Sequence, residues 1–471
     1  MLKTIRLTAL LLSGTGLLPA ARAAEPPGPG EPAVAVLGNA EAWKQLPPAE
    51  KGGGQPLPSW ARALAGVMPR STAALLRVDF VQRARSPLDP KLRAEMRWVA
   101  ADANRCRYTA AYALYDVRRA GLDEADVAAL CQGDYSREVL ATRAALEFAR
   151  KMTLNSASVT DAEFAALVKQ YGEKDVAAMV LLAAWANFQD RLVLSLGSTL
   201  EPDGPLPPLD VVFAPGQLVT RQPAAQRGNA PPRQNAPISP GAGKDLVEDD
   251  SGWTNVPYEE LQARLERQRI RSTRVRVPSW DEVERVLPPD FMWPNKVVWN
   301  LVCLGYQPDL GGAWETYLRT SSIETADGLN RVFGSSLFWV TTRSVNCAYC
   351  MGHCEFSLEN AVLSKPEIAE RTRRLASGEW STFPADEQRA YDFARKLTDT
   401  PWAVSAENVQ GLLQDFGPKR GLMVIVAACR GHYMTRVSNG FQLSLERENV
   451  FRHWGPATLA QDPAAPKASG R

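Results

Sequence analysis

The sequence contains few histidines and almost no net charge. Only 3 of its 471 residues are histidine, and 54 lysines and arginines nearly balance 52 aspartates and glutamates. No basic stripe interrupts this balance, so the chain lacks the concentrated positive face that nucleic-acid binding requires. Long alternations of apolar and polar residues, which indicate β-strands, are also absent. We therefore expect neither a nucleic-acid partner nor a fold built on β-sheets.

Long apolar runs are missing as well. The run nearest the N-terminus, residues 7–18, is too short to cross a bilayer core of about 30 Å. It follows Lys3 and Arg6 and precedes a small-residue site that ends at Ala23, which is the three-part pattern of a secretory signal peptide. We predict an exported protein, periplasmic or secreted, without a membrane span.

Two parts of the chain resemble each other. The sequence LEFARKMT at residues 146–153 returns as YDFARKLT at residues 391–398, an offset of 245 residues. At the same offset, the apolar residues 176–192 match residues 421–437, and with four residues of slack the segment around Cys106 matches the one around Cys347. Because the matches keep their order along the chain, we predict two tandem homologous domains. Further towards the N-terminus, we match Trp60 to Trp280.

Each repeat has the apolar periodicity of a helical bundle. Phe164, Leu167 and Tyr171 follow helical spacing, and residues 177–194 form an almost continuous apolar helix. Helix-capping sequences begin at Thr160, Ser364 and Ser405. We predict an all-α fold of two tandem helical-bundle domains joined by a Pro-rich linker.

The domain boundaries follow from composition. Pro, Gly, Gln and Asn are abundant in residues 202–245, which cannot bury enough apolar surface to fold. We divide the chain into a signal peptide (1–23), a Pro/Gly-rich flank (24–57), a first domain (58–201), a linker (202–245), a second domain (246–454) and a disordered tail (455–471).

Three of the seven cysteines form a cluster in the second domain. On a helix, Cys347, Cys350 and Cys354 share one face, and His353 lies within reach of Cys350. We expect Asn346 to cap this helix, so that its first turn favours a thiolate. Two cysteines in a CxxC at a helix N-terminus form a common redox device, because when one thiol is oxidised the other can resolve it by forming a disulfide.

Other interpretations of the CxxC remain open. The pair can form a structural disulfide, or it can bind zinc together with His353 or Cys354. A c-type haem site is disfavoured because Met351 follows Cys350. In the first domain Thr109 replaces the second thiol, so CxxC chemistry is restricted to the second domain. An architectural disulfide would more readily be kept in both copies.

The order of these elements resembles the carboxymuconolactone decarboxylase / alkylhydroperoxidase D-like superfamily. The resemblance rests on Asn-Cys-Ala-Tyr-Cys at residues 346–350, the FARKLT segment and a last apolar helix that ends in Arg436. It covers about half of the chain, residues 90–200 and 330–445. It implies helical bundles that form homo-oligomers and a peroxidase reaction in which Cys350 attacks a hydroperoxide and Cys347 resolves the product.

The sequence departs from the family pattern at two positions of the proton relay. Cys354 stands where the family has His, with His353 displaced by one residue, and Ser335 stands where it has Glu. His353, or His432 of the last helix, is then the candidate to assist Cys350, although His432 is also explained as a hydrogen-bonding core residue. In the first domain Glu95 lies eleven residues before Cys106, close to the family's Glu position. In that domain, however, Thr109 replaces the attacking thiol.

These observations predict a thiol-dependent peroxidase that uses Cys350, Cys347 and His353, with Cys354 and His432 as further candidates. Its partners would be a small hydroperoxide and a thiol reductant, and we expect neither a cofactor nor a metal. Two alternatives remain. One is a redox-inactive or metal-binding member of the family, and the other is a cysteine-independent lyase, against which the scarcity of histidine counts.

Overall fold

The computed structural model describes residues 33–214, 217–218, 256–288, 291, 296–326, 328–361 and 363–451. The predicted signal peptide, most of the predicted linker and the predicted tail lie outside the described residues. Within the described part the prediction of an all-α protein is confirmed, since eighteen α-helices account for nearly all regular structure.

The N-terminal half contains α1 to α8 and the only two strands of the described residues. Its elements are α1 (Asn39–Gln45), β1 (Ala49–Lys51), α2 (Ser59–Ala65), α3 (Pro69–Phe80), the π-helix η1 (Val81–Arg85), α4 (Pro90–Ala103), α5 (Arg107–Arg119), α6 (Glu124–Cys131), α7 (Leu140–Leu154), the 3-10 turn η2 (Ser156–Ser158), α8 (Asp161–Leu196) and β2 (Val212–Phe213).

The C-terminal half has only helices as regular secondary structure within its described residues. Its elements are α9 (Tyr258–Ile270), α10 (Trp280–Val286), α11 (Val298–Tyr306), α12 (Pro308–Glu324), α13 (Arg331–Ser344), α14 (Ala348–Asn360), α15 (Lys365–Ser377), α16 (Ala385–Asp399), the 3-10 turn η5 (Pro401–Ala403), α17 (Ala406–Phe416) and α18 (Pro418–Phe441).

The predicted capping sequences start helices where expected. The Thr160 hydroxyl accepts the Glu163 N–H (3.2 Å), while the Glu163 carboxylate accepts the Thr160 N–H (2.9 Å). Ser364 and Ser405 form the same reciprocal capping box at α15 and α17. Each box satisfies backbone N–H groups that a helix start leaves without a partner. The three helix starts predicted from sequence are confirmed.

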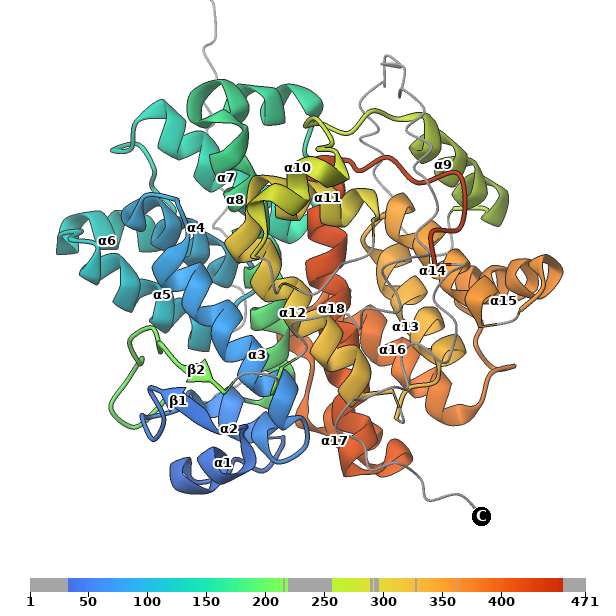
Figure 1. The fold of residues 1–471 in the computed structure, drawn as a ribbon, viewed down its shortest axis with the longest axis horizontal. Coiled ribbons are helices and arrows are strands. Elements are labelled where there is room, and N and C mark those ends of the chain that lie inside the picture. The colour runs from blue at the N-terminus through green and yellow to red at the C-terminus, as the bar shows by residue number, and fades with distance from the viewer. Residues whose placement is uncertain are drawn as a thin grey trace, which may run out of the picture.

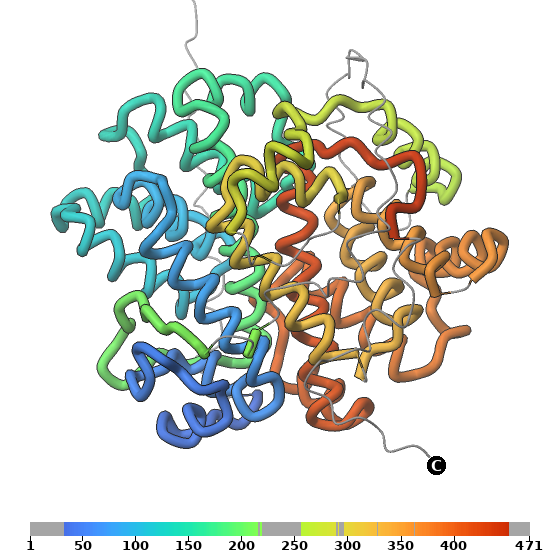
Figure 2. The backbone as a smooth tube through the Cα atoms, viewed as in Figure 1, coloured from blue at the N-terminus to red at the C-terminus, as the bar shows by residue number. Residues whose placement is uncertain are grey.

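The long helices α8 and α18 lie against each other at the centre of the molecule (Figure 1). The backbone trace places the blue-to-green N-terminal half on one side and the yellow-to-red C-terminal half on the other (Figure 2). A second contact between the halves is made by α3 and α12. The two halves therefore meet along two helix pairs, α8 with α18 and α3 with α12, and each half supplies one helix of each pair.

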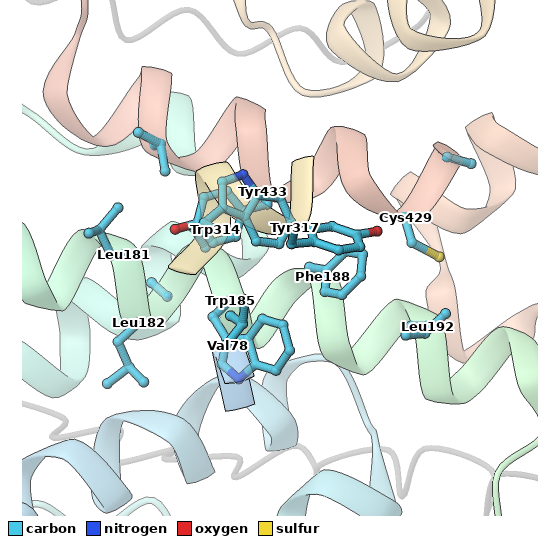
Figure 3. Packing of buried hydrophobic residues seen from close by; sticks show 14 of the residues in the cluster. Val78, Leu181, Leu182, Trp185, Phe188, Leu192, Trp314, Tyr317, Cys429 and Tyr433 are labelled. Carbon is cyan, nitrogen blue, oxygen red and sulfur yellow. The ribbon is translucent and has the colours of Figure 1, made fainter. Parts of the chain in front are cut away.

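Aromatic side chains fill the space where the halves meet (Figure 3). The Trp314 ring of α12 stacks on Tyr433 of α18 with 3.5 Å between centroids, and Phe188 of α8 meets Trp314 edge-on at 5.3 Å. These residues belong to one buried apolar cluster that includes side chains from both halves. Burial of such large rings makes separation of the halves costly in free energy.

Backbone conformations recur at the offsets of the sequence repeat. Gly172, which kinks α8, has φ 80° and ψ 159°, and Gly417, which separates α17 from α18, has φ 78° and ψ 157°. Glycine supplies this conformation because it has no Cβ. Before α5 and α14, Arg105 and Asn346 also share a positive φ, 51° and 54°. The matched residues therefore perform the same turns.

The N-terminal ends of the two halves match differently from our sequence comparison. Trp60 is the second residue of α2, which precedes the Pro-initiated helix α3. In the C-terminal half, the second residue of the helix before the Pro-initiated α12 is Trp299 of α11. Trp280 instead packs in a separate small cluster with Val283. Trp299 therefore takes the place in the helix order that Trp60 takes in the N-terminal half, whereas Trp280, to which we matched Trp60, lies outside the main core cluster.

More of the Pro-rich sequence is ordered than its composition predicts. In the flank, residues 33–57 contain α1 and β1, and Leu46 and Leu57 are buried. The first part of the linker supplies β2, which pairs antiparallel with β1. Two short strands that satisfy each other's backbone groups tie these segments to the N-terminal half.

One helix in the described part of the chain, α8, is long and apolar enough to cross a membrane by length and composition. Its apolar stretch is fully buried inside the protein. The same burial is expected of the central helix of a folded core.

Candidate active site

The turn between α13 and α14 positions the cysteine cluster. Asn346 takes the left-handed conformation there, and Arg264 of α9 donates to its Oδ1 (3.1 Å). We expected Asn346 to cap α14, but the N-cap is Cys347, whose Sγ accepts the Cys350 N–H at 3.3 Å. The cap lies one residue later because Asn346 makes the left-handed turn, which asparagine tolerates better than most residues.

The three clustered thiols are buried. Cys347, Cys350 and Cys354 are 0%, 3% and 1% exposed, and the Cys350 thiol donates to Ser438 Oγ of α18 at 3.3 Å. Burial, assisted by the neighbouring Cys347, raises the pKa of Cys350 well above its usual value. Burial also raises the pKa of Cys354. The helix N-terminus therefore does not favour a thiolate at Cys350, because removing the charge from water costs more than the helix dipole returns.

His353 pairs with a carboxylate instead of a thiol. Its Nε2 lies 2.7 Å from Glu446 Oε2, and Oε1 of the same carboxylate accepts the Tyr349 hydroxyl (3.2 Å) and the Val298 N–H (2.7 Å). Burial alone would raise the pKa of Glu446, but His353 and these hydrogen bonds outweigh it, and the pKa is lowered. The contact with Glu446 thus engages the imidazole that we expected to assist Cys350.

Glu446 is the site residue that the sequence did not reveal. It lies in the segment 442–451 after α18, which crosses α14. Leu445 packs directly over Gly352 and leaves no room for a Cβ there, and Asn449 donates to the Phe356 carbonyl (2.9 Å). No sequence motif identifies Glu446. The one feature of the sequence that could have indicated it is an acidic residue directly after Leu445, which is buried. The segment covers the helix that carries all three thiols.

His432 is a neutral hydrogen-bonding residue of the core. Its Nδ1 must accept from Arg436 Nη1 (2.7 Å), because a guanidinium only donates. Nε2 then carries the proton and faces Thr398 Oγ1 at 3.3 Å. Burial, with the charges of Arg191 and Arg436, lowers the pKa of His432 well below its usual value. This arrangement is the core role that we weighed against a catalytic one.

The N-terminal half repeats the same network with asparagine in place of histidine. Asn187 Oδ1 accepts from Arg191 Nη1 (2.8 Å), and Asn187 Nδ2 donates to Thr153 Oγ1 (3.2 Å). Arg191 also donates to the Leu397 carbonyl at the end of α16 (3.1 Å). In return, Arg436 donates to the Thr153 carbonyl at the end of α7 (3.3 Å). Each arginine therefore satisfies carbonyls at a helix end of the opposite half.

The first-half counterpart of the CxxC is a polar cluster without a second thiol. Thr109 donates to Asp190 Oδ1 (2.7 Å), and Asn104 donates to Asp190 Oδ2 (2.8 Å). Burial, with the charge of Asp190, raises the pKa of Cys106 to about 12. These contacts fit a structural role for Cys106.

Ser335, at the position where we noted that the resembled family has Glu, pairs with another serine. The Ser335 hydroxyl donates to Ser357 Oγ (2.8 Å). In the other half, burial raises the pKa of Glu95 to about 7, with Lys91 Nζ at 3.6 Å. In the half that carries the CxxC, burial raises the pKa of Glu355, which follows Cys354 on α14.

All seven cysteines are free thiols. Cys429 of α18 is fully buried in the aromatic interface (Figure 3). Within the described ranges no three His, Cys, Asp or Glu side chains are grouped so that they could hold a metal ion. In comparison with known proteins, no protein-family model and no curated protein matches this chain.

Proposed function

We propose that the chain is a duplicated helical unit of the carboxymuconolactone decarboxylase / alkylhydroperoxidase D-like type, with one redox-competent copy. The shared backbone turns at Gly172 and Gly417 support the duplication, as do the matching networks around Asn187 and His432. Residues 58–201 and 246–454 are the two copies in this proposal. Residues 202–245 connect them.

The activity that we propose is thiol-dependent reduction of a small hydroperoxide. The Cys350 thiolate attacks the terminal oxygen of ROOH, the O–O bond breaks, and Cys350 sulfenic acid and ROH form after one proton is taken up. The Cys347 thiol then displaces water from the sulfenic acid to form the disulfide. A dithiol reductant restores both thiols and leaves as its own disulfide.

The observation that carries this proposal is the position of the two thiols on α14. Cys347 occupies the N-cap and Cys350 lies in the first turn, with Cys347 Sγ on the Cys350 N–H. Two sulfur atoms within one turn can form a disulfide without unfolding the helix. Because Cys350 is only 3% exposed and its thiol faces Ser438 of α18, the packing around α14 must open to admit peroxide.

Single serine variants test the proposal. Cys350→Ser should abolish peroxide consumption with dithiothreitol as donor, and Cys347→Ser should leave a sulfenic acid that is trapped by dimedone. Cys429→Ser, a variant of a buried cysteine outside the cluster, is the matched control and should keep wild-type turnover. Undiminished turnover in Cys350→Ser would refute the proposal.

A second candidate, a redox-inactive member of the same family, is favoured by the burial of all three thiols. In that case the cysteines serve only as small core residues. Thiol counting before and after peroxide treatment separates the two candidates. Loss of two thiols per chain supports the peroxidase, and seven unchanged thiols support the inactive protein.

The cellular setting of this proposal depends on residues outside the described part of the chain. Residues 1–23 support export, so we propose a periplasmic or secreted enzyme whose reductant is a thiol of that compartment. Assembly into homo-oligomers is part of the same family-based proposal. Size-exclusion chromatography with light scattering measures the assembly state directly.

A further inference from the structure

A small polar pocket lies in the N-terminal half, away from the cysteine cluster. It is enclosed by α3, η1, α4, α5 and α8, and its polar lining includes Asp79, Gln82, Arg83, Arg93, Arg97 and Gln189. Arg93 is half-buried, whereas Gln82 and Arg97 are 1% and 9% exposed. The π-helix η1 contributes Gln82 and Arg83, and such irregular turns are frequent at functional sites.

Two buried groups of this pocket have no hydrogen-bond partner in the described structure. Both Nε2 and Oε1 of Gln82 are unpaired, as is Nη1 of Arg97. A buried polar atom without a partner costs free energy, so native proteins satisfy it with water or a ligand. The free set comprises N–H donors on both residues and one carbonyl acceptor on Gln82.

Arg97 is held so that its free nitrogen remains available. Its Nη2 donates to Asp190 Oδ1 and to Gln189 Oε1 (3.1 Å), and Gln189 donates in turn to Asp79 Oδ1 (3.1 Å). Thr109 donates to the same oxygen of Asp190, and Asn104 donates to its other oxygen, Oδ2 (2.8 Å). Because one edge of the guanidinium is engaged, the other edge is a preorganised donor.

The arginines of the pocket differ in their partners. Arg83 pairs with Asp79 (3.5 Å) and Asp116 (2.8 Å), and Arg97 pairs with Asp190. Arg93 has no ion pair with a carboxylate among the described residues, and its Nη1 donates to the Ser86 carbonyl (3.3 Å). Three aspartates thus balance the three arginines, and Arg93 is the one of these arginines whose guanidinium makes no direct ion pair and can contact the carboxylate of a ligand.

We propose that this pocket binds a small hydroxy acid. One carboxylate oxygen accepts from Arg97 Nη1 and Gln82 Nε2, the neighbouring hydroxyl donates to Gln82 Oε1, and Arg93 supplies the counter-charge. The ligand has two or three carbons, because the pocket is small. This site is independent of the proposed peroxidase activity. The pocket is also confined to one half, since Phe338 and Met434 stand at the repeat offsets of Arg97 and Gln189.

Calorimetric titration of the full chain with glycolate tests the proposal. Glycolate should bind, acetate should bind at least about tenfold more weakly because it lacks the hydroxyl, and uncharged ethylene glycol should not bind. Gln82→Met should weaken glycolate binding by at least about tenfold, and so should Arg93→Gln. Gln414→Met, which changes an exposed glutamine of α17, is the control and should bind as the wild type does.

Thermal unfolding without ligand provides a second measurement. Gln82→Met should be no less stable than the wild type, because the amide that it removes has no partner in the protein. Absence of glycolate binding by the wild-type chain, or equal binding by Gln82→Met, would overturn the proposal. Equal binding of acetate and glycolate would overturn the role of the hydroxyl. If Gln82→Met does not fold, Arg93→Gln decides the same question.

Discussion

Exchange of His432 for the asparagine of the other half is a sharp test of its role. Asn187 accepts from Arg191 and donates to Thr153 in the same way that His432 accepts from Arg436 and donates to Thr398. In His432→Asn the amide can make both bonds, and only part of the buried ring volume is lost. We expect this variant to cost about 1–2 kcal/mol of unfolding free energy.

His432→Ala is the matched comparison. It leaves a buried guanidinium N–H without its acceptor, which costs about 1.5–3 kcal/mol, and it removes the ring contacts, which costs about 2 kcal/mol more. Urea unfolding followed by tryptophan fluorescence measures the difference between the two variants. If His432→Asn is as unstable as His432→Ala, the proposed hydrogen-bond equivalence is wrong. If it folds normally but loses peroxide turnover, His432 has a chemical role.

The pH dependence of stability tests the charge state of His432. Its pKa lies well below 6.5 in the folded protein, so the unfolded chain binds a proton more readily as the pH falls. The stability that this group contributes is present above pH 6.5 and is lost below it. The wild type should therefore lose more stability than His432→Asn between pH 6.5 and 5. Parallel pH profiles would contradict a neutral, buried imidazole.

Three further predictions concern the thiols, the cover of α14 and the interface between the halves. Peroxide turnover should rise about tenfold per pH unit up to at least pH 9, because the pKa of Cys350 is raised; a plateau near pH 7 would contradict this. Glu446→Gln should cost about 2 kcal/mol of unfolding free energy at neutral pH. Because the pKa of Glu446 is lowered below 4.5, this cost should vanish as the pH falls below 4.5 and through the lowered pKa. A cost that stays constant in urea titrations at acid pH would refute the pairing of Glu446 with His353. Gly440→Ala places a Cβ 2.8 Å from Val180 Cγ1, so it should lower the unfolding free energy in urea by about 1–3 kcal/mol. Gly334→Ala is the control and should not destabilise the protein, because the space around Gly334 is open.

Local features of the fold were readable from the sequence because neighbouring residues produce them. Helix starts at Thr160, Ser364 and Ser405 require only a side chain and a backbone N–H three residues apart. The buried helix that follows Gly172 was visible as an apolar run. The turns at Gly172 and Gly417 are separated by the same offset as the sequence repeat. The cap of α14 was misplaced by one residue, since a short sequence does not distinguish an N-cap from a left-handed turn at Asn346.

The contacts that define the candidate site depend on tertiary structure. His353 and Glu446 are 93 residues apart, and Arg436 reaches a carbonyl 283 residues away. Periodicity shows which face of a helix is buried, but it does not show which distant group that face meets. The raised pKa of Cys350 also follows from burial beneath other segments and not from its place on the helix.

The sequence by itself therefore determined that the protein is helical, where several helices begin, and that Cys347 and Cys350 share a helical turn. These properties arise from interactions within a few residues. Only the tertiary structure decided that His353 pairs with Glu446 rather than with a thiol, that the arginines cross between the halves, and that Gln82 and Arg97 face one pocket. Those outcomes depend on which helices pack together, because burial and the partner across the interface set the free energy of a polar group.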